Sequence, residues 1–121
     1  MTPHQVGRWG EVIAARHLVQ AGWIILDRNF RAGRKEVDIV ARQDGMVIFV
    51  EVKTRRSLGC GHPLEAITHK KRREIAEVAR HWLSRNPGAA QSVRFDAISV
   101  LAAERSAPLV EHLTDAWRVG V

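Results

Sequence analysis

The sequence predicts an α/β fold, a mixed sheet flanked by helices, with elements in the order helix, strand, strand, strand, helix, strand. Apolar residues recur at helical spacing in two separate segments. Runs rich in Val, Ile and Phe lie between and after these segments, and Asp44-Gly45 is the two-residue signal of a tight type I′ hairpin. Two helices in this order can cover both faces of one sheet.

The first half of the chain supplies one helix and three strands. The helix is predicted from Pro3 to Ala21, with Gly22 as its stop. Trp23 to Phe30 is predicted to form the first strand, and the basic turn 31–35 leads into the hairpin of the second and third strands.

The second half supplies the other helix and the remaining strands. Pro63 is a favourable first residue for a helix that runs to about Asn86, before Pro87 and Gly88. The buried face of this helix is predicted to hold Ile67, Ile75, Val78, Ala79 and Trp82. Val93 to Leu101 is predicted as a fourth strand and Pro108 to Leu113 as a short fifth on the sheet edge.

The hairpin fixes which side chains meet across the strand pair. If Asp44 and Gly45 form the loop, Gln43 pairs with Met46, and Asp38 falls directly opposite Glu51. Lys53 is on the same face, opposite Glu36, because side chains alternate with period 2. A cluster of charges is therefore expected on a ribbon that is otherwise apolar.

Two opposed carboxylates repel each other, so Asp38 and Glu51 require compensation. A divalent cation supplies it, since Mg²⁺ prefers one or two carboxylates and completes its shell with water and substrate phosphate. Lys53 would lie beside the water that such a metal activates. The alternative is a surface charge ladder in which Lys53 neutralises Glu36 and nearby arginines offset the other two.

Size and charge limit the class of protein. A chain of 121 residues fits a single domain, expected to span residues 1–121. Lys and Arg number 19 against 13 Asp and Glu, a net charge of +6 that favours a polyanionic partner such as nucleic acid.

We expect a cytoplasmic protein, because neither a membrane span nor a signal peptide is evident. Cys60, the one cysteine, fits a reducing compartment, and with His62 it offers too few ligands for zinc.

Several short motifs occur in a recognisable order. Pieces that span most of the chain to about residue 100 are Gly7-Arg8-x-Gly10-Glu11, Ala14-Ala15, Gly22, Asn29-x-Arg31, Glu36-x-Asp38, Phe49-Val50-Glu51-Val52-Lys53-x-Arg55, Lys71 and Arg94-Phe95-Asp96. Together with the element order they resemble the PD-(D/E)xK, or restriction-endonuclease-like, nucleases. The chain is most similar to the YraN family of small bacterial endonuclease-like proteins, and the combination is far more specific than any single motif.

The resemblance implies a metal-dependent DNA endonuclease that uses Mg²⁺ or Mn²⁺. By analogy, Asp38 and Glu51 hold the metal, Lys53 orients or deprotonates the attacking water, and Glu11 completes the site as in Holliday-junction-resolvase-like members. Helical spacing agrees, since Glu11 shares a face with Ala14, Ala15 and Leu18. The same resemblance implies branched or recombination and repair intermediates as substrates and a possible homodimer.

Some of these residues also have a structural interpretation. Glu11 could instead form an ion pair with Arg8, and for Glu36 the pair with Lys53 is the preferred interpretation. Lys35 stands where the family usually has a glycine, which makes the bend before the second strand an open question.

Basic side chains gather in two stretches that could contact DNA phosphates on either side of the carboxylates. The predicted nucleic-acid-binding residues are Arg34, Lys35, Arg55, Arg56, Lys70, Lys71 and Arg72. Such contacts provide affinity and register without reading bases. The alternative function is a DNA-binding module of nuclease fold that is weak or inactive in catalysis and acts with a helicase or recombination partner. RNA is a less favoured substrate, because no exposed aromatic platform is evident.

Overall fold

The computed structural model describes residues 1–56, 63–102 and 106–119. Cys60 and His62 lie outside these residues. The elements follow one another as α1 (Pro3–Gln20), β1 (Ile24–Ala32), β2 (Lys35–Gln43), β3 (Met46–Arg55), a 3₁₀ turn η1 (Pro63–Ala66), α2 (His69–Arg85), β4 (Ser92–Leu101) and β5 (Leu109–Trp117). The predicted α/β class and element order are confirmed, and the fifth strand is longer than expected.

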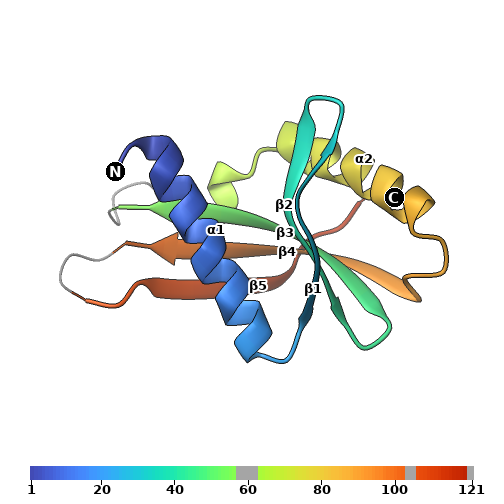
Figure 1. The fold of residues 1–121 in the computed structure, drawn as a ribbon. Helices are drawn as coiled ribbons and strands as arrows, with labels where there is room; N and C mark the ends of the chain where they lie inside the picture. Colours follow the sequence, from blue (N-terminus) through green and yellow to red (C-terminus); the bar gives the residue numbers. More distant parts are fainter. Residues whose placement is uncertain (57–62, 103–105, 120–121) are drawn as a thin grey trace.

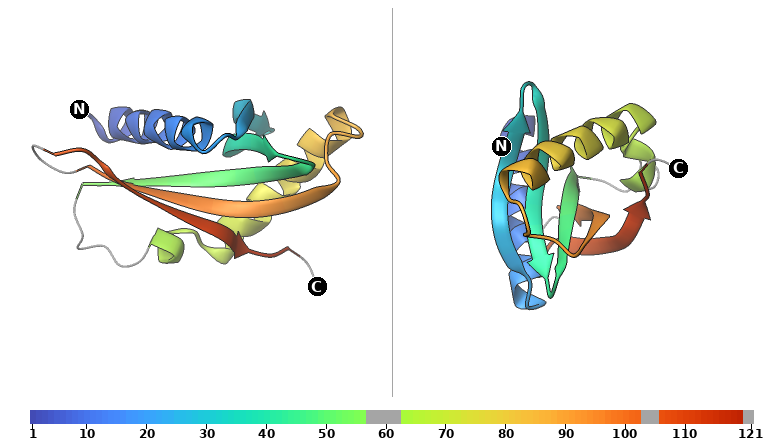
Figure 2. Two further views of the ribbon diagram at one scale, coloured as in Figure 1. Left: turned by 90° about the horizontal axis from the view of Figure 1, so that it is seen from below. Right: turned by 90° about the vertical axis from the view of Figure 1, so that its right-hand side faces the viewer.

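The five strands form one mixed sheet in the order β1-β2-β3-β4-β5. β3 and β4 are parallel and are joined by the crossover that contains α2, whereas the other neighbours are antiparallel. Helices α1 and α2 cover opposite faces of the sheet, as the edge-on view of Figure 2 shows. The structure is therefore three-layered, with an apolar core on each side of the sheet.

The first helix has the cap that its sequence allows. The Thr2 side chain accepts a hydrogen bond from the backbone N–H of Gln5, and the Gln5 side chain accepts one from the backbone N–H of Thr2. Gly22, just beyond the helix end, has a φ of +89°, a value that glycine adopts without strain. The predicted start and stop of this helix are confirmed.

The hairpin forms in the predicted register at its turn and opens into a fork at the other end. Gln43 pairs with Met46, and the recorded pairs continue as far as Ile39 with Val50. Beyond them β2 turns away from β3 together with β1, which Figure 1 shows as a hairpin projecting from the sheet. The turn is not of type I′, because Asp44 has a positive φ and Gly45 does not.

The second helix starts later than predicted. Pro63 opens the separate turn η1, and α2 begins at His69, where the Thr68 side chain caps the backbone N–H of Lys71 at 3.1 Å. Ile67 precedes the helix but is buried as expected, together with the predicted apolar face of α2. The later start places Lys71 in the first turn of α2.

The tryptophans are mainly core residues, as predicted. Trp23, Trp82 and Trp117 are buried, and Trp9 of α1 is half-buried and packs against the core. The Trp82 indole also donates to Asp27 Oδ2 at 3.0 Å, which ties α2 to β1. None of the four forms an exposed platform for stacking bases.

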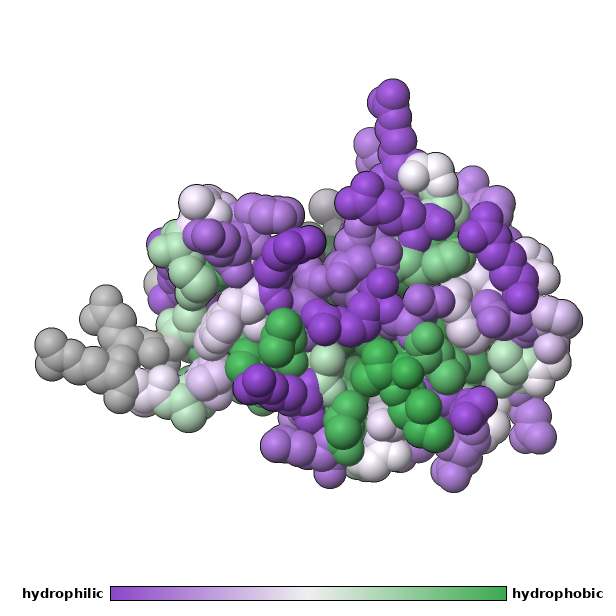
Figure 3. Space-filling model, viewed as in Figure 1, coloured by the Kyte–Doolittle hydropathy of each residue, from purple (hydrophilic) through white to green (hydrophobic). Residues whose placement is uncertain are grey.

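One face of the molecule carries both polar and apolar regions. In Figure 3 hydrophilic side chains cover the part where the β1–β2 hairpin projects, and apolar side chains gather lower on the same face. Exposed apolar side chains on α1 and at the start of β1 are Val12, Val19 and Ile24. Within the described residues, no helix is long and apolar enough to cross a membrane.

Candidate active site

The Asp38 side chain occupies the point where β2 and β3 separate. Its Oδ2 accepts a hydrogen bond from the backbone N–H of Val52 at 2.7 Å. The prediction that Asp38 pairs directly with Glu51 is therefore corrected in detail, since the ladder is recorded only as far as Ile39 and Val50. Beyond that pair, the backbone N–H of Val52 donates to the side chain of Asp38, and this hydrogen bond fixes Asp38 at the fork.

Asp38 and Glu51 nevertheless lie together, and their proximity disfavours the charged form of Asp38. Glu51 is 3% exposed, and its carboxyl group is a hydrogen-bond partner of Asp38. Burial, the hydrogen bond with Glu51 and the charge of Glu51 raise the pKa of Asp38 to about 9. The N–H of Val52 and the charge of Lys71 oppose this rise but are weaker. The site therefore has an excess of negative charge that a proton relieves.

Lys71 of α2 contacts the same site. Its Nζ lies 3.5 Å from Glu51 Oε2 and 3.4 Å from the backbone carbonyl oxygen of Glu36. Sequence analysis grouped Lys71 with the phosphate-binding cations and missed this contact. The cap at Thr68 sets the phase of α2, so the contact depends on a helix start that the sequence pattern placed too early.

Glu11 approaches the fork from α1 and is held by Asn29. The Asn29 amide donates to Glu11 Oε1 at 2.6 Å, so the alternative in which Arg8 pairs with Glu11 is not observed. Burial raises the pKa of Glu11 above its ordinary value; the Asn29 hydrogen bond opposes the rise, and the charges of Asp38 and Glu36 add to it. Glu11 thus belongs to the same electrostatic cluster as Asp38.

Asn29 is a site residue that sequence analysis missed. The same amide also donates to Glu36 Oε1 at 3.0 Å, so it links a carboxylate of α1 to one of β2. The backbone of Asn29 has a φ of +51°, a conformation that asparagine tolerates better than most side chains. Its place in the Asn29-x-Arg31 motif was the available signal.

The predicted pair of Glu36 with Lys53 is wrong. Glu36 accepts hydrogen bonds from Asn29 and from Arg31 Nε, the latter at 2.8 Å. The physical reason is the fork, which separates β2 from β3 before these two positions. Lys53 instead lines a cavity of about 450 Å³ between α1 and the end of β3, and Glu11 lines the same cavity.

The other predicted cations lie on the two arms of the fork. Arg34 and Lys35 are at the β1–β2 turn, where Lys35 forms an ion pair with Glu77 of α2. Arg55 and Arg56 are at the end of β3, and Arg56 Nη2 donates to the Met1 carbonyl at 2.6 Å. Arg34 and Lys35 are thus separated from Arg55 and Arg56 by the fork. Lys70 and Arg72 lie in the first turn of α2.

The donor set fits a hard divalent cation. Mg²⁺ and Mn²⁺ favour carboxylate oxygen and require few protein ligands. Asp38 and Glu51 offer such oxygens, and a cation there would relieve the repulsion that raises the pKa of Asp38. Within the described residues, no group of three or more His, Cys, Asp or Glu side chains is arranged to hold a metal. A cation at the fork would therefore depend on water or substrate phosphate for the rest of its shell.

The element order, the mixed sheet and the carboxylates at the fork are consistent with a restriction-endonuclease-like core. The chain belongs to the uncharacterised protein family UPF0102, whose family model matches residues 10–100. This finding confirms the resemblance to the YraN family.

Relatives resemble the chain over almost their full length. A UPF0102 protein of Rhodococcus opacus (strain B4) is 43% identical over 112 residues, which cover 93% of this chain and 95% of the relative. A UPF0102 protein of Trichlorobacter lovleyi is 47% identical over 113 residues, which cover 93% and 89% of the two chains. These names establish the family and assign no activity.

Proposed function

We propose that the protein is a DNA endonuclease that hydrolyses phosphodiester bonds with the help of Mg²⁺ or Mn²⁺. The observation that carries the proposal is the pair of Asp38 and Glu51, two neighbouring carboxyl groups at the fork of an apolar strand pair, with Glu51 only 3% exposed. Idle buried charge of this kind is costly to a fold. Val52, whose backbone N–H binds Asp38, lines the same cavity as Glu11 and Lys53, so the pair lies next to residues that a substrate could reach.

Each residue has a distinct task in the proposed reaction. Asp38 and Glu51 would hold the cation, which would lower the pKa of a bound water and offset charge on the phosphoryl oxygens. Lys53, at the wall of the cavity, donates hydrogen bonds to the attacking water or to the phosphate oxygens. Glu11 lines the same cavity and is oriented by Asn29. Lys71 limits the negative charge at Glu51, so that a phosphate can approach.

DNA is the proposed substrate because the chain has an excess of cations on both sides of the fork. The branched form of the substrate, a homodimer and action in recombination or repair remain parts of the proposal that rest on the resemblance alone. A second candidate is a DNA-binding module of this fold that has little catalytic activity. The pair of Asp38 and Glu51 favours the enzyme, since a module that only binds DNA has no need of two neighbouring buried carboxyl groups.

A cleavage assay tests the proposal. Purified protein is incubated with labelled duplex, flap, single-stranded and four-way-junction DNA in Mg²⁺, Mn²⁺ or EDTA. Cleavage is expected with either metal and absent in EDTA, and Asp38→Ala, Glu51→Ala and Lys53→Ala should each abolish it while the protein stays folded. Binding of every substrate without cleavage in either metal would favour the DNA-binding module instead.

A further inference from the structure

A second concentration of positive charge lies on the α2 side of the sheet, apart from the carboxylates. It surrounds a pocket of about 310 Å³ lined by His69, Arg72, Arg73, Trp117, Arg118 and Val119. Three of these six residues are arginines, and they come from two elements far apart in the sequence. A concave surface of this charge suits an anion with several oxygen atoms.

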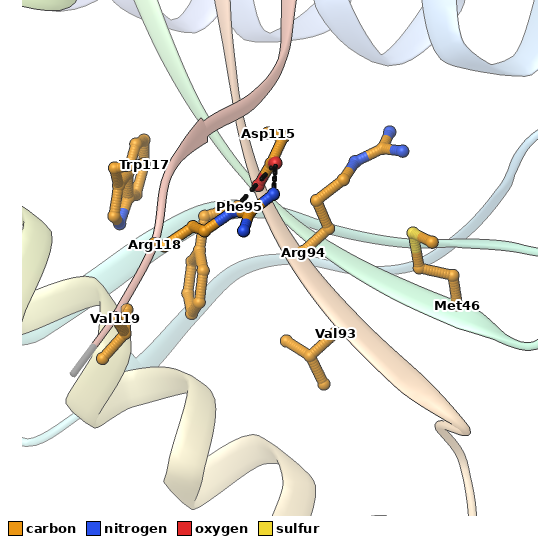
Figure 4. Close-up of a pocket in the computed structure, with 8 residues that line it drawn as sticks. All are labelled: Met46, Val93, Arg94, Phe95, Asp115, Trp117, Arg118 and Val119. Atoms are coloured by element: carbon orange, nitrogen blue, oxygen red, sulfur yellow. Dashed lines mark hydrogen bonds and ion pairs between the residues drawn. The ribbon is translucent and has the colours of Figure 1, made fainter. Parts of the chain in front are cut away.

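The pocket is built on fixed contacts. Arg72 Nε donates to the Ile67 carbonyl at 3.0 Å, and the Arg72 guanidinium lies 5.9 Å from the centre of the Trp117 ring. Arg118 donates to Asp115 Oδ2 at 2.9 Å, the ion pair drawn in Figure 4, where Trp117 and Val119 lie beside it along the end of the chain. Asp115 offsets part of the charge of Arg118, and Arg72 and Arg73 add the cations of α2 to the pocket.

A buried donor at the pocket lacks an acceptor. Trp117 is 6% exposed, and its Nε1 has no hydrogen-bond partner among the described residues. An indole N–H that is buried without an acceptor destabilises a fold. Trp117 lines the pocket, and an anionic oxygen that entered far enough to contact Nε1 would satisfy this donor. The unsatisfied N–H and the arginines are independent observations that both indicate an oxyanion.

The pocket is close enough to the proposed active site for one DNA strand to contact both. Trp117 pairs with Phe95 and Phe95 pairs with Phe49, two residues before Glu51 in β3. Two strand spacings and two residues of rise separate the positions by about 10 Å across the sheet and about 7 Å along it. Lys71 and Arg72, neighbours in α2, connect them, since one contacts Glu51 and the other contacts Trp117.

We infer that this pocket binds a backbone phosphate of the DNA strand that passes through the active site. The inference rests on the proposed function, which makes DNA the ligand. It adds a second contact between the protein and the DNA strand that is cleaved. A cleaved phosphodiester near the fork and a held phosphate at the pocket would fix the direction in which the strand crosses α2. Arg73, Trp117 and Arg118 thereby join the proposed DNA contacts.

The test follows the Trp117 indole N–H by ¹⁵N-edited NMR in EDTA, where no cleavage is needed. The chain has four tryptophans, and Trp117→Phe assigns the signal while retaining an aromatic ring. A short DNA duplex should shift this signal at a phosphate concentration at which inorganic phosphate alone has little effect. No shift with DNA would overturn the inference. An equal shift with inorganic phosphate would overturn it too, since it would indicate a site for free phosphate or a nucleotide.

A matched pair of variants tests the same inference through affinity. Arg73→Gln should weaken duplex binding about three- to tenfold and reduce the log–log salt slope by about 0.9, the contribution of one phosphate contact. Arg80→Gln removes the same charge two turns later on α2, outside the pocket, and should change affinity less than twofold. Equal effects of the two variants would overturn the inference.

These outcomes are distinguishable from those of the cleavage assay. If DNA shifts the Trp117 signal but is never cleaved, the phosphate-binding pocket is supported and the proposed nuclease activity is contradicted. If DNA is cleaved but does not shift the Trp117 signal, the nuclease activity is supported and the phosphate-binding pocket is contradicted.

Discussion

Asp38 has a strongly raised pKa, which destabilises the folded protein at neutral pH when no metal is bound. The pKa of Asp38 is raised to about 9 in the folded state, against about 4 in an unfolded chain. A raised folded pKa stabilises the protein below the unfolded pKa, and this contribution is lost as pH rises from about 4 through about 9. The metal-free protein should therefore become less stable across this range.

Asp38→Asn should remove much of that pH dependence. The Asn oxygen can still accept from the Val52 N–H, and the amide can donate to Glu51 in place of the shared proton. We expect the variant in EDTA to gain about 1–3 kcal/mol of unfolding free energy at pH 8 and almost none at pH 5, as measured by urea unfolding. A variant that is less stable than wild type at pH 8 would show that protein groups already neutralise the pair.

Asn29 offers a second test at the same scale. Asn29→Asp keeps the shape of the side chain but adds a carboxylate between Glu11 and Glu36, two groups that now accept from its amide. The change should destabilise the metal-free protein by about 0.5–1 kcal/mol at pH 7 and by less near pH 4, where carboxylates take up protons. Asn29→Gly is the control, because it keeps the positive φ and removes the amide without adding charge. Equal losses in both variants at both pH values would mean that the amide merely fills space.

At the scale of elements, α1 packs closely against β3 because Gly10 has no side chain at the point where it meets Thr54. A Cβ placed on Gly10 would lie 2.8 Å from Thr54 Cβ, too close for two carbon atoms, whereas one on Gly7 would meet nothing within 4 Å. Gly10→Ala should thus destabilise the protein by about 1–3 kcal/mol in thermal or urea unfolding, since α1 must move away from β3. Gly7→Ala should be neutral or stabilise by up to about 1 kcal/mol, because alanine favours helix. A Gly10→Ala protein as stable as wild type would contradict this account of the α1–β3 contact.

The elements also show what the sequence could and could not predict. Alternation and the Asp44-Gly45 turn placed Asp38 and Glu51 together, because these signals are local. They could not reveal the fork, since the departure of β2 from β3 depends on packing against β1 and α2. For that reason Lys53 was paired with Glu36, and the contact of Lys71 with Glu51 was missed. Asn29 was missed because its role depends on α1, which reaches it only in the folded chain.

At the scale of the whole molecule, the charge of +6 predicts DNA binding that is strongly weakened by salt. Replacing Lys71 and Arg72 with glutamine should flatten the log–log plot of affinity against salt by roughly 0.9 per lost phosphate contact. Fluorescence anisotropy with a labelled duplex in EDTA measures both slopes. Arg16→Gln with Arg80→Gln is the matched control, since it removes two exposed charges elsewhere on α1 and α2. An unchanged slope in the Lys71 and Arg72 variant would place the start of α2 away from DNA.

The central claim is that Asp38 and Glu51 exchange a shared proton for a divalent cation. The raised pKa of Asp38 predicts that the pair binds a proton at pH 7, and Mn²⁺ bound by the two carboxyl groups would displace it. Calorimetric titration with Mn²⁺ in buffers of different ionisation enthalpy counts that proton directly. We predict one bound Mn²⁺ with release of about one proton per ion at pH 7 in the wild-type protein, and loss of both in Asp38→Asn. Absence of Mn²⁺ binding, or binding with no proton released, would contradict the assignment of this pair as a metal site.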